Sequence, residues 1–357
     1  MSFKNFPMVT RVVYGRGCSR QIEEIVKPVR KNGHPVIYFA DHCFKGKALE
    51  KNIPIQKNDK IIFIDTDREP TTNYVDRLRD DLISEFGEIS GIIGYGGGSV
   101  LDMTKAVALM MTNKGSSADY QGWDLVINEG VYHAGVPTLS GTGAEVSRTC
   151  VLTGPDRKLG MNSDFTPFNQ VILDPKLTED APKNQAFYTG MDCYIHCIES
   201  LNGTYLNAFS RSYGEKALEL CKKIYLEKEE WDDESYEDLM MASWHGGMSI
   251  AYSQVGVAHA LSYGLSYVMG IRHGLGNCIA FNQIEEYYPE GVRDFKKIIE
   301  KFKITLPDHV CSKLSEDEMK KMVGIAIRLE PLWENAFGKN WREIVTEKKV
   351  RELYEKM

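Results

Sequence analysis

The chain changes character at about Pro182, and this change constrains its fold more than any other feature. Before it, short β-branched or aromatic runs alternate with helical patterns, which is typical of β-α-β units and a largely parallel sheet. After it the strand signals stop, and long helical patterns follow one another. We therefore expect an α/β domain over residues 1–182 and an all-helical domain over residues 183–357.

The spacing of apolar residues predicts the elements of the first half. Strands are expected at Pro35–Ala40, Ile61–Asp65, Gly91–Gly94, Ala134–Pro137 and Val171–Leu173. Between them, apolar residues three to four positions apart predict helices over Asn73–Phe86 and Val100–Met111. The stretch from Val146 to Asp174 is rich in turn residues, and we expect an excursion there before the last strand.

Helical spacing dominates the second half. Helices are expected over Asn184–Ser200, Phe209–Glu230, Tyr236–Tyr252, Val257–Tyr267 and Asn282–Phe302. The charge-free stretch from Leu239 to Ile271 contains several serines and glycines, so it is interpreted as helix buried in protein rather than as a membrane span. A chain of 357 residues exceeds what one core usually organises, and we expect the two halves to pack on each other around a cleft.

Composition excludes several classes of partner. The net charge is −7 and no long run of Lys or Arg occurs, so neither a nucleic acid nor a membrane is an expected partner. Met1–Val13 holds no apolar stretch long enough for a signal-peptide core, which favours a cytoplasmic protein. The eight cysteines have no zinc-type Cys-x-x-Cys spacing and are expected to be reduced, mostly as small buried hydrophobes.

A glycine-rich segment, Gly94-Tyr-Gly-Gly-Gly-Ser99, follows an apolar strand and precedes a helix. Consecutive glycines let backbone N–H groups approach a pyrophosphate, and a helix N-terminus favours negative charge. A tight strand-to-helix turn without a ligand explains the same residues. Because neither a Walker A motif nor the Rossmann fingerprint is present, a nucleotide site here is a variant of the usual ones.

A second segment of small and hydroxyl residues, Pro137–Glu145, also follows a strand. Two such loops at strand ends suit a dinucleotide that lies across the sheet edge. Asp41 closes another strand, where a carboxylate can bind the adenosine ribose and repel a 2′-phosphate. A helix N-cap is the alternative role for Asp41.

Four residues of the second half are candidate metal ligands. Asp192 and His196 stand four positions apart on one helical face, within an apolar helix where an unpartnered carboxylate is costly. His259 and His273 follow in or near the charge-free stretch. One carboxylate and three imidazoles suit Fe²⁺, Zn²⁺ or Co²⁺ better than Mg²⁺ or Ca²⁺. The alternatives are a solvated Asp/His contact and histidines that bond to backbone carbonyls.

The order of motifs resembles that of the iron-containing (group III) alcohol dehydrogenase family over nearly the whole chain. These motifs are GGGSVLDMTK, PTLSGTGAEVSR, KLGMNS, ILDPKLT, TGMDCYIHCIES, GVAHALSYGL and RHGLGN. The resemblance implies an N-terminal dinucleotide-binding α/β domain, an all-α C-terminal domain and one divalent metal, Fe²⁺ or Zn²⁺, in the cleft. The implied metal ligands are Asp192, His196, His259 and His273.

The same resemblance implies NAD(P) as the cofactor, and Asp41 favours NAD over NADP because its carboxylate would repel a 2′-phosphate. We also expect a homodimer. The residues that match family contacts to the nucleotide are Asp41, Gly96, Gly97, Gly98, Ser99, Asp102, Thr138, Ser140, Thr142 and Lys158. One position departs from the pattern, because Tyr263 stands where many members have a histidine suspected of relaying a proton. Tyr263 and Arg272, which precedes His273, are the candidate catalytic residues.

The implied reaction is the oxidation of a primary alcohol to an aldehyde with hydride transfer to NAD. The segment Thr149–Leu206 looks most like the branch that oxidises the terminal (C8) hydroxyl of 3-deoxy-manno-octulosonate, an acidic sugar of lipopolysaccharide biosynthesis. A general short-chain or polyol alcohol dehydrogenase is one alternative. A redox-neutral lyase like the dehydroquinate synthases is another, but it needs converging bases, and only scattered ones such as Arg148, Arg157 and Arg272 occur. A non-catalytic nucleotide or metal sensor is a third.

Overall fold

The computed structural model describes residues 8–357, which form two compact units. The first contains residues 8–139 and 144–181, and the second contains residues 140–143 and 182–357. The prediction about a signal peptide rests partly on residues 1–7, which lie outside the described residues.

The first unit is built on a six-stranded sheet in which every neighbouring pair is parallel. Its order is β1 (Arg11–Tyr14), β9 (Gln170–Leu173), β6 (His133–Pro137), β4 (Gly91–Gly96), β2 (Val36–Asp41) and β3 (Lys60–Ile64). The five strands expected from the sequence are confirmed. The edge strand β1 was not expected, because it is short and mostly exposed, so no apolar run marks it.

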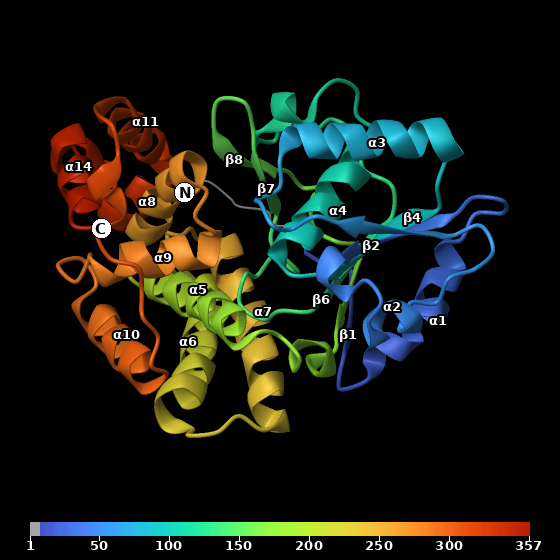
Figure 1. Cartoon of the computed structure of the whole chain (residues 1–357), viewed down its shortest axis with the longest axis horizontal. Helices are drawn as coiled ribbons and strands as arrows, with labels where there is room; N and C mark the ends of the chain where they lie inside the picture. The colour runs from blue at the N-terminus through green and yellow to red at the C-terminus, as the bar shows by residue number, and fades with distance from the viewer. Residues whose placement is uncertain (1–7) are drawn as a thin grey trace. The chain divides into compact units, whose positions relative to one another are not determined.

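Helices cover both faces of this sheet, so the side chains of a central strand are buried on both sides. In β2, Ile37 and Phe39 join the core beneath α3 (Thr72–Phe86) and α4 (Gly98–Met110). The alternating residues, including Tyr38, join a second core with α1 (Ile22–Val26). Figure 1 shows α3 and α4 on one side of the sheet and α1 on the other. Burial on two faces explains the continuous apolar runs that predicted these strands.

The segment Val146–Asp174 contains two strands that the turn-rich composition had hidden. β7 (Thr149–Thr153) and β8 (Lys158–Asn162) form an antiparallel hairpin, and β5 (Gly122–Trp123) pairs with β8. The buried side chains of this hairpin, among them Leu152, extend the core that includes α4. The excursion is therefore a small second sheet.

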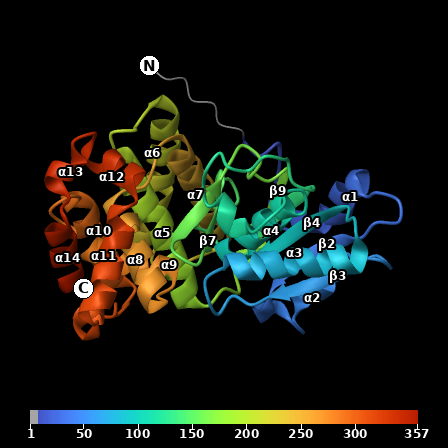
Figure 2. The same ribbon diagram turned by 90° about the horizontal axis from the view of Figure 1, so that it is seen from above.

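The second unit consists of helices and the loops that join them, and its described residues form no strand. Its α-helices are α5 (Lys183–Leu201), α6 (Ala208–Lys222), α7 (Asp233–Tyr252), α8 (Val257–Met269), α9 (His273–Asn282), α10 (Pro289–Lys301), α11 (Glu316–Ile327), α12 (Glu330–Phe337), α13 (Trp341–Ile344) and α14 (Glu347–Glu355). Figure 2 shows α8 and α9 beside α5, and α5 packs against α6, α7 and α9.

Two of the expected helices need correction. The helix predicted at Asn282–Phe302 begins only at Pro289, because proline lacks an N–H group and fits the first turn of a helix. Asn282 instead ends α9, a helix that the apolar spacing had not predicted. The helix predicted at Phe209–Glu230 ends as α6 at Lys222 and continues as a single π-helical turn, Lys223–Glu227.

The charge-free stretch corresponds to the end of α7 and to α8, both within the helical unit. Over residues 8–357, no helix combines the length and apolar character that crossing a bilayer requires.

None of the eight cysteines forms a disulfide, and Cys43 is the exposed one among them. Cys193 and Cys197 are buried in α5, as the sequence predicted.

Candidate active site

Three helices of the second unit supply the four predicted metal ligands. Asp192 and His196 lie one turn apart on α5, in a stretch where every residue from Thr189 to Ser200 is buried. His259 is the third residue of α8, and His273 is the first residue of α9. The helix that the spacing failed to predict, α9, thus brings the last of these residues to the others.

The ligand atoms converge on one oxygen. Oδ1 of Asp192 lies 3.6 Å from Nε2 of His196, 3.4 Å from Nε2 of His259 and 3.8 Å from Nε2 of His273. Two ligands that each bind one ion at about 2.1 Å in a tetrahedral arrangement stand roughly 3.4 Å apart. The spacing is longer than a direct hydrogen bond of about 2.9 Å and fits ligands that share an ion.

The electrostatics of these groups favour cation binding. Burial alone raises the pKa of Asp192, but the three imidazoles outweigh burial and hold this pKa well below its usual range. Burial lowers the pKa of His196 to about 4, so its imidazole is neutral at pH 7. Burial also lowers the pKa of His259, but the carboxylates of Glu199 and Asp192 outweigh it and raise this pKa to about 9. Asp192 and Glu199 therefore stabilise a positive charge at His259, and a divalent ion that binds Nε2 of His259 would take the place of the proton there.

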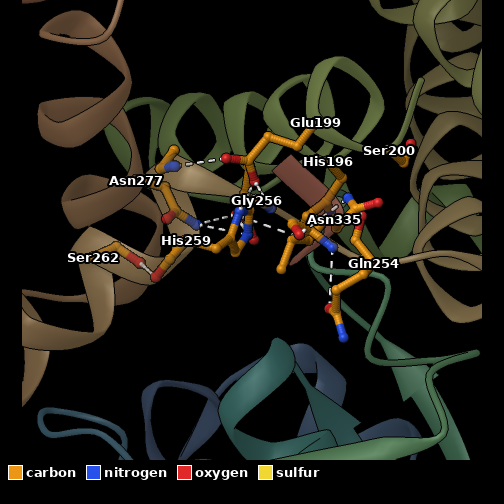
Figure 3. Close-up of polar contacts among 12 residues, drawn as sticks. His196, Glu199, Ser200, Gln254, Gly256, His259, Ser262, Asn277 and Asn335 are labelled. Carbon is orange, nitrogen blue, oxygen red and sulfur yellow. Dashed lines mark hydrogen bonds and ion pairs between the residues drawn. The ribbon is translucent and has the colours of Figure 1, made fainter. Parts of the chain in front are cut away.

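Glu199 is a residue of this site that the sequence analysis missed. Its carboxylate is buried and accepts a hydrogen bond from Nδ1 of His259 at 2.6 Å. Figure 3 draws both residues. The spacing could have revealed it, because Asp192, His196 and Glu199 stand at i, i+4 and i+7 and so share one face of α5. A carboxylate behind a metal-binding histidine is a common arrangement in metal sites.

Asn277 was missed as well, although it lies one turn after His273 on α9. Its Nδ2 donates to Oδ1 of Asp192 at 2.6 Å and lies 3.0 Å from Nε2 of His259 and 3.2 Å from Nε2 of His273. Its Oδ1 is buried and, within residues 8–357, makes no hydrogen bond. The amide NH2 group of Asn277 thus donates toward the point that the Asp192 oxygen and the imidazole nitrogens face, and that set of acceptor atoms fits a divalent ion such as Fe²⁺ or Zn²⁺.

The two candidate catalytic residues lie beside His273. The ring of Tyr263 packs edge-on against the ring of His273, with centroids 5.8 Å apart. A phenol, with an ordinary pKa of about 10, is a much poorer base near neutrality than an imidazole at about 6.5. Arg272 is the N-cap residue of α9, and its Nη1 lies 3.3 Å from Oε1 of Gln185 on α5.

The other two arginines considered in the sequence belong to the α/β unit and have local partners. Arg148 forms ion pairs with Asp124 and Asp164, and Arg157 donates to the carbonyl oxygen of Gln121. Arg272 is therefore the one among these three arginines that lies in the same unit as the candidate ligands.

The predicted nucleotide residues of the first unit gather at the carboxyl ends of its strands. Gly96 ends β4, Gly97 precedes α4, and Gly98 and Ser99 open that helix. Thr138 follows β6 and donates its N–H to the carbonyl oxygen of Gly96 at 3.0 Å. A Cβ on Gly96 would stand 2.5 Å from the Val100 side chain, so the turn requires glycine there.

The order of the strands makes this edge a switch point. From β2 the chain goes to β3 on one side, and then to β4 on the other side of β2. Ligands of open α/β sheets bind at such points, outside the carboxyl ends of the strands. Asp41 ends β2 and thus flanks the switch point. Its Oδ1 accepts from the N–H of Cys43 and its Oδ2 from Oγ1 of Thr66, both at 2.9 Å, so the capping role is present.

The remaining predicted nucleotide residues lie outside the glycine turn and outside β2. Asp102 accepts from the N–H of Val151 at 3.0 Å, and the buried Lys158 pairs with Glu69 at 3.2 Å. Ser140 and Thr142 belong to the helical unit. The glycine between them lies so close to α5 that an added Cβ would stand 1.8 Å from the carbonyl oxygen of Thr189.

Two family models match the chain. The model for iron-containing alcohol dehydrogenase covers residues 9–175, and the model for the C-terminal domain of the Fe-containing alcohol dehydrogenase family covers residues 186–355. The chain belongs to the iron-containing alcohol dehydrogenase family. It is therefore an enzyme, an oxidoreductase of the metal-dependent alcohol dehydrogenase class.

Individual relatives agree with this assignment. A sulfoacetaldehyde reductase of Bilophila wadsworthia is 28% identical over 77% of this chain and 72% of its own length. An iron-containing alcohol dehydrogenase from Thermotoga maritima superposes with a TM-score of 0.79 at 24% identity, over 98% of both chains. A sulfoacetaldehyde reductase from Bifidobacterium kashiwanohense, solved with NAD⁺, also gives 0.79 at 21% identity, over 99% of this chain and 98% of its own. The solved structures confirm the fold.

We predict that His259→Ala and His273→Ala each lose most of the bound metal, since each removes one of four converging ligands. NAD binding should persist, because the strand ends that carry the glycine turn belong to the other unit. Metal analysis after dialysis and calorimetric titration with NAD measure the two properties. The control is His245→Ala, which removes a histidine of α7 that packs on Tyr213 and should keep its metal. Full metal occupancy in either ligand variant would exclude that residue as a ligand.

Proposed function

We propose that this enzyme oxidises a primary alcohol to an aldehyde with NAD as the hydride acceptor. One Fe²⁺ or Zn²⁺ would be held by the carboxylate of Asp192 and by Nε2 of His196, His259 and His273. The observation that carries the proposal is the convergence of three imidazole nitrogens on one oxygen of a buried, ionised carboxylate. In this proposal residues 1–182 form the nucleotide domain and residues 183–357 form the metal domain.

The protein's own groups then have distinct tasks. A bound divalent ion supplies Lewis acidity that lowers the pKa of an alcohol hydroxyl. Asp192 gives the site its negative charge, and the side chains of Asp192, His196 and His259 are buried. His273 has the most exposed side chain of the four, at 27%, so a small substrate would reach the site on its side.

The nucleotide would bind at the strand ends of the α/β unit. Gly97 offers no capping side chain to α4, so N–H groups of the first turn are available to a pyrophosphate. Asp41 would bind the adenosine ribose on the neighbouring strand, because each oxygen of a carboxylate can accept a further hydrogen bond. This placement favours NAD over NADP.

For the substrate we propose an acidic sugar alcohol, specifically the terminal (C8) hydroxyl of 3-deoxy-manno-octulosonate. Arg272 supports an anionic substrate, because its backbone is fixed at the start of α9 next to His273 and its guanidinium can bind a carboxylate in bidentate fashion. The relative from Bilophila wadsworthia is named for sulfoacetaldehyde, which is itself an anionic aldehyde. A neutral short-chain or polyol alcohol is the alternative, and the two are separated by the test of Arg272.

Asp41→Ala should narrow the preference for NAD over NADP. Relief of a like-charge contact worth about 1.4 kcal/mol or more corresponds to a tenfold or greater change in the affinity ratio. Calorimetric titration with each dinucleotide gives the ratio. Asp67→Ala is the matched control, since it removes an exposed carboxylate just after β3 and should leave the ratio unchanged. If wild type and Asp41→Ala show the same ratio of NAD to NADP affinity, Asp41 acts only as a helix cap.

Arg272→Ala should lower kcat/KM for an acidic sugar alcohol by roughly tenfold or more, the scale of one lost charged hydrogen bond. The rate with a small neutral alcohol should be nearly unchanged. Arg148→Ala and Arg157→Ala serve as controls, because both side chains have partners within the α/β unit. If all three variants keep the wild-type selectivity for acidic over neutral alcohols, the acidic-substrate proposal fails and the general alcohol dehydrogenase remains.

A further inference from the structure

A second carboxylate, that of Glu199, is completely buried on the same face of α5 as Asp192 and His196. A buried carboxylate is costly unless hydrogen-bond donors compensate for the lost water. Three N–H groups do so here, and one of them belongs to the imidazole of His259. These three donors belong to the start of α8 and to the residue before it.

The contacts divide between the two carboxylate oxygens. Oε2 accepts from Nδ1 of His259 at 2.6 Å and from the N–H of Gly256 at 2.9 Å. Oε1 accepts from the N–H of Ala258 at 2.6 Å. Figure 3 shows Glu199 above the Gly256 backbone, with the His259 ring beside it. Glu199 therefore fixes both the backbone and the ring of the segment that carries a candidate ligand.

The bond to the ring decides which nitrogen of His259 is available to a metal. When Nδ1 donates its proton to Glu199, the lone pair of neutral imidazole is on Nε2, which faces Oδ1 of Asp192 at 3.4 Å. In the other tautomer Nε2 would carry the proton and could not bind an ion. His196 differs, since its Nδ1 makes no hydrogen bond within residues 8–357.

We propose that Glu199 is a positioning residue that fixes the tautomer and the orientation of His259 and thereby sets the affinity of the metal site. This inference rests on the proposed function, because it needs His259 to bind the metal. It assigns to α5 three tasks on one face: a charged ligand, a neutral ligand and the group that orients a ligand on another helix.

The alternative is that Glu199 only holds the loop before α8, and the structure offers a matched control for that role. Nδ2 of Asn335 donates to the carbonyl oxygens of Gln254 and Val255, at 2.7 and 3.2 Å, and so holds the same loop through neighbouring residues (Figure 3). Asn335→Ala should loosen the loop without removing the bond to the His259 ring.

The test is the affinity of the full chain for Zn²⁺, measured by competition with a chelating dye. Glu199→Gln keeps the size of the side chain but removes its charge, and we expect a 10- to 100-fold loss of affinity, the usual effect of losing such a partner. Asn335→Ala should bind Zn²⁺ with nearly the wild-type affinity. An equal loss in both variants would show that loop packing alone is responsible and would overturn the proposal.

A spectroscopic readout separates the ring contact from general destabilisation. In the Zn²⁺-loaded wild type, a proton shared between Nδ1 of His259 and a carboxylate at 2.6 Å should give a strongly downfield ¹H NMR signal. The signal should disappear in Glu199→Gln and persist in Asn335→Ala. If Glu199→Gln does not fold, Glu199→Asp keeps the charge on a shorter side chain and should bind Zn²⁺ more weakly with a shifted signal.

The outcomes distinguish this proposal from the proposed function. If wild type and His259→Ala bind Zn²⁺ equally, the metal site itself is wrong. If His259→Ala loses Zn²⁺ but Glu199→Gln, or Glu199→Asp in its place, keeps wild-type affinity and the downfield signal, only the positioning role of Glu199 is wrong.

Discussion

The carboxylate of Asp192 is buried and ionised, and three imidazole nitrogens face one of its oxygens at 3.4–3.8 Å. An ionised carboxylate inside a protein needs strong partners, and a cation shared with the imidazoles is the partner that this geometry fits. α9 packs against both α5 and α8, and this packing brings the residues of the three helices into one cluster. Glu199 and Asn277 complete it by donating to, or accepting from, the ligands themselves.

The α/β unit is subject to a different constraint. Backbone N–H groups and one carboxylate must lie at the same edge of its sheet. Parallel strands achieve this because their carboxyl ends lie together, so Asp41 and the glycine turn after β4 flank the switch point of the sheet. The chemistry of the family needs both constraints at once, since hydride transfer joins a nucleotide to a substrate at the metal. The protein contributes to this chemistry by placing the nucleotide and the substrate and by supplying the charged groups around them.

Local pattern predicted the strands that form continuous apolar runs and missed a short, exposed edge strand. β2 was visible as a continuous apolar run, whereas β1 is short and mostly exposed. In the site, the spacing of Asp192 and His196 pointed to a pair on one face. His259 and His273 were added because they lie in or near an apolar stretch, and the family resemblance implied the same four ligands. The spacing also places Glu199 on the same face of α5 as Asp192 and His196. Its bond to His259 could not be predicted, because spacing within one helix does not show a contact with another helix.

The central claim is that one divalent ion binds Asp192 and the three histidines. Anomalous X-ray diffraction from crystals of the metal-loaded enzyme, recorded on both sides of the metal's absorption edge, tests it directly. The account predicts one strong peak about 2.1 Å from the carboxylate oxygen and the three Nε2 atoms. A fully loaded, active enzyme whose only peak lies elsewhere, for example at the exposed cluster of His42, Asp65 and Asp67, would contradict it.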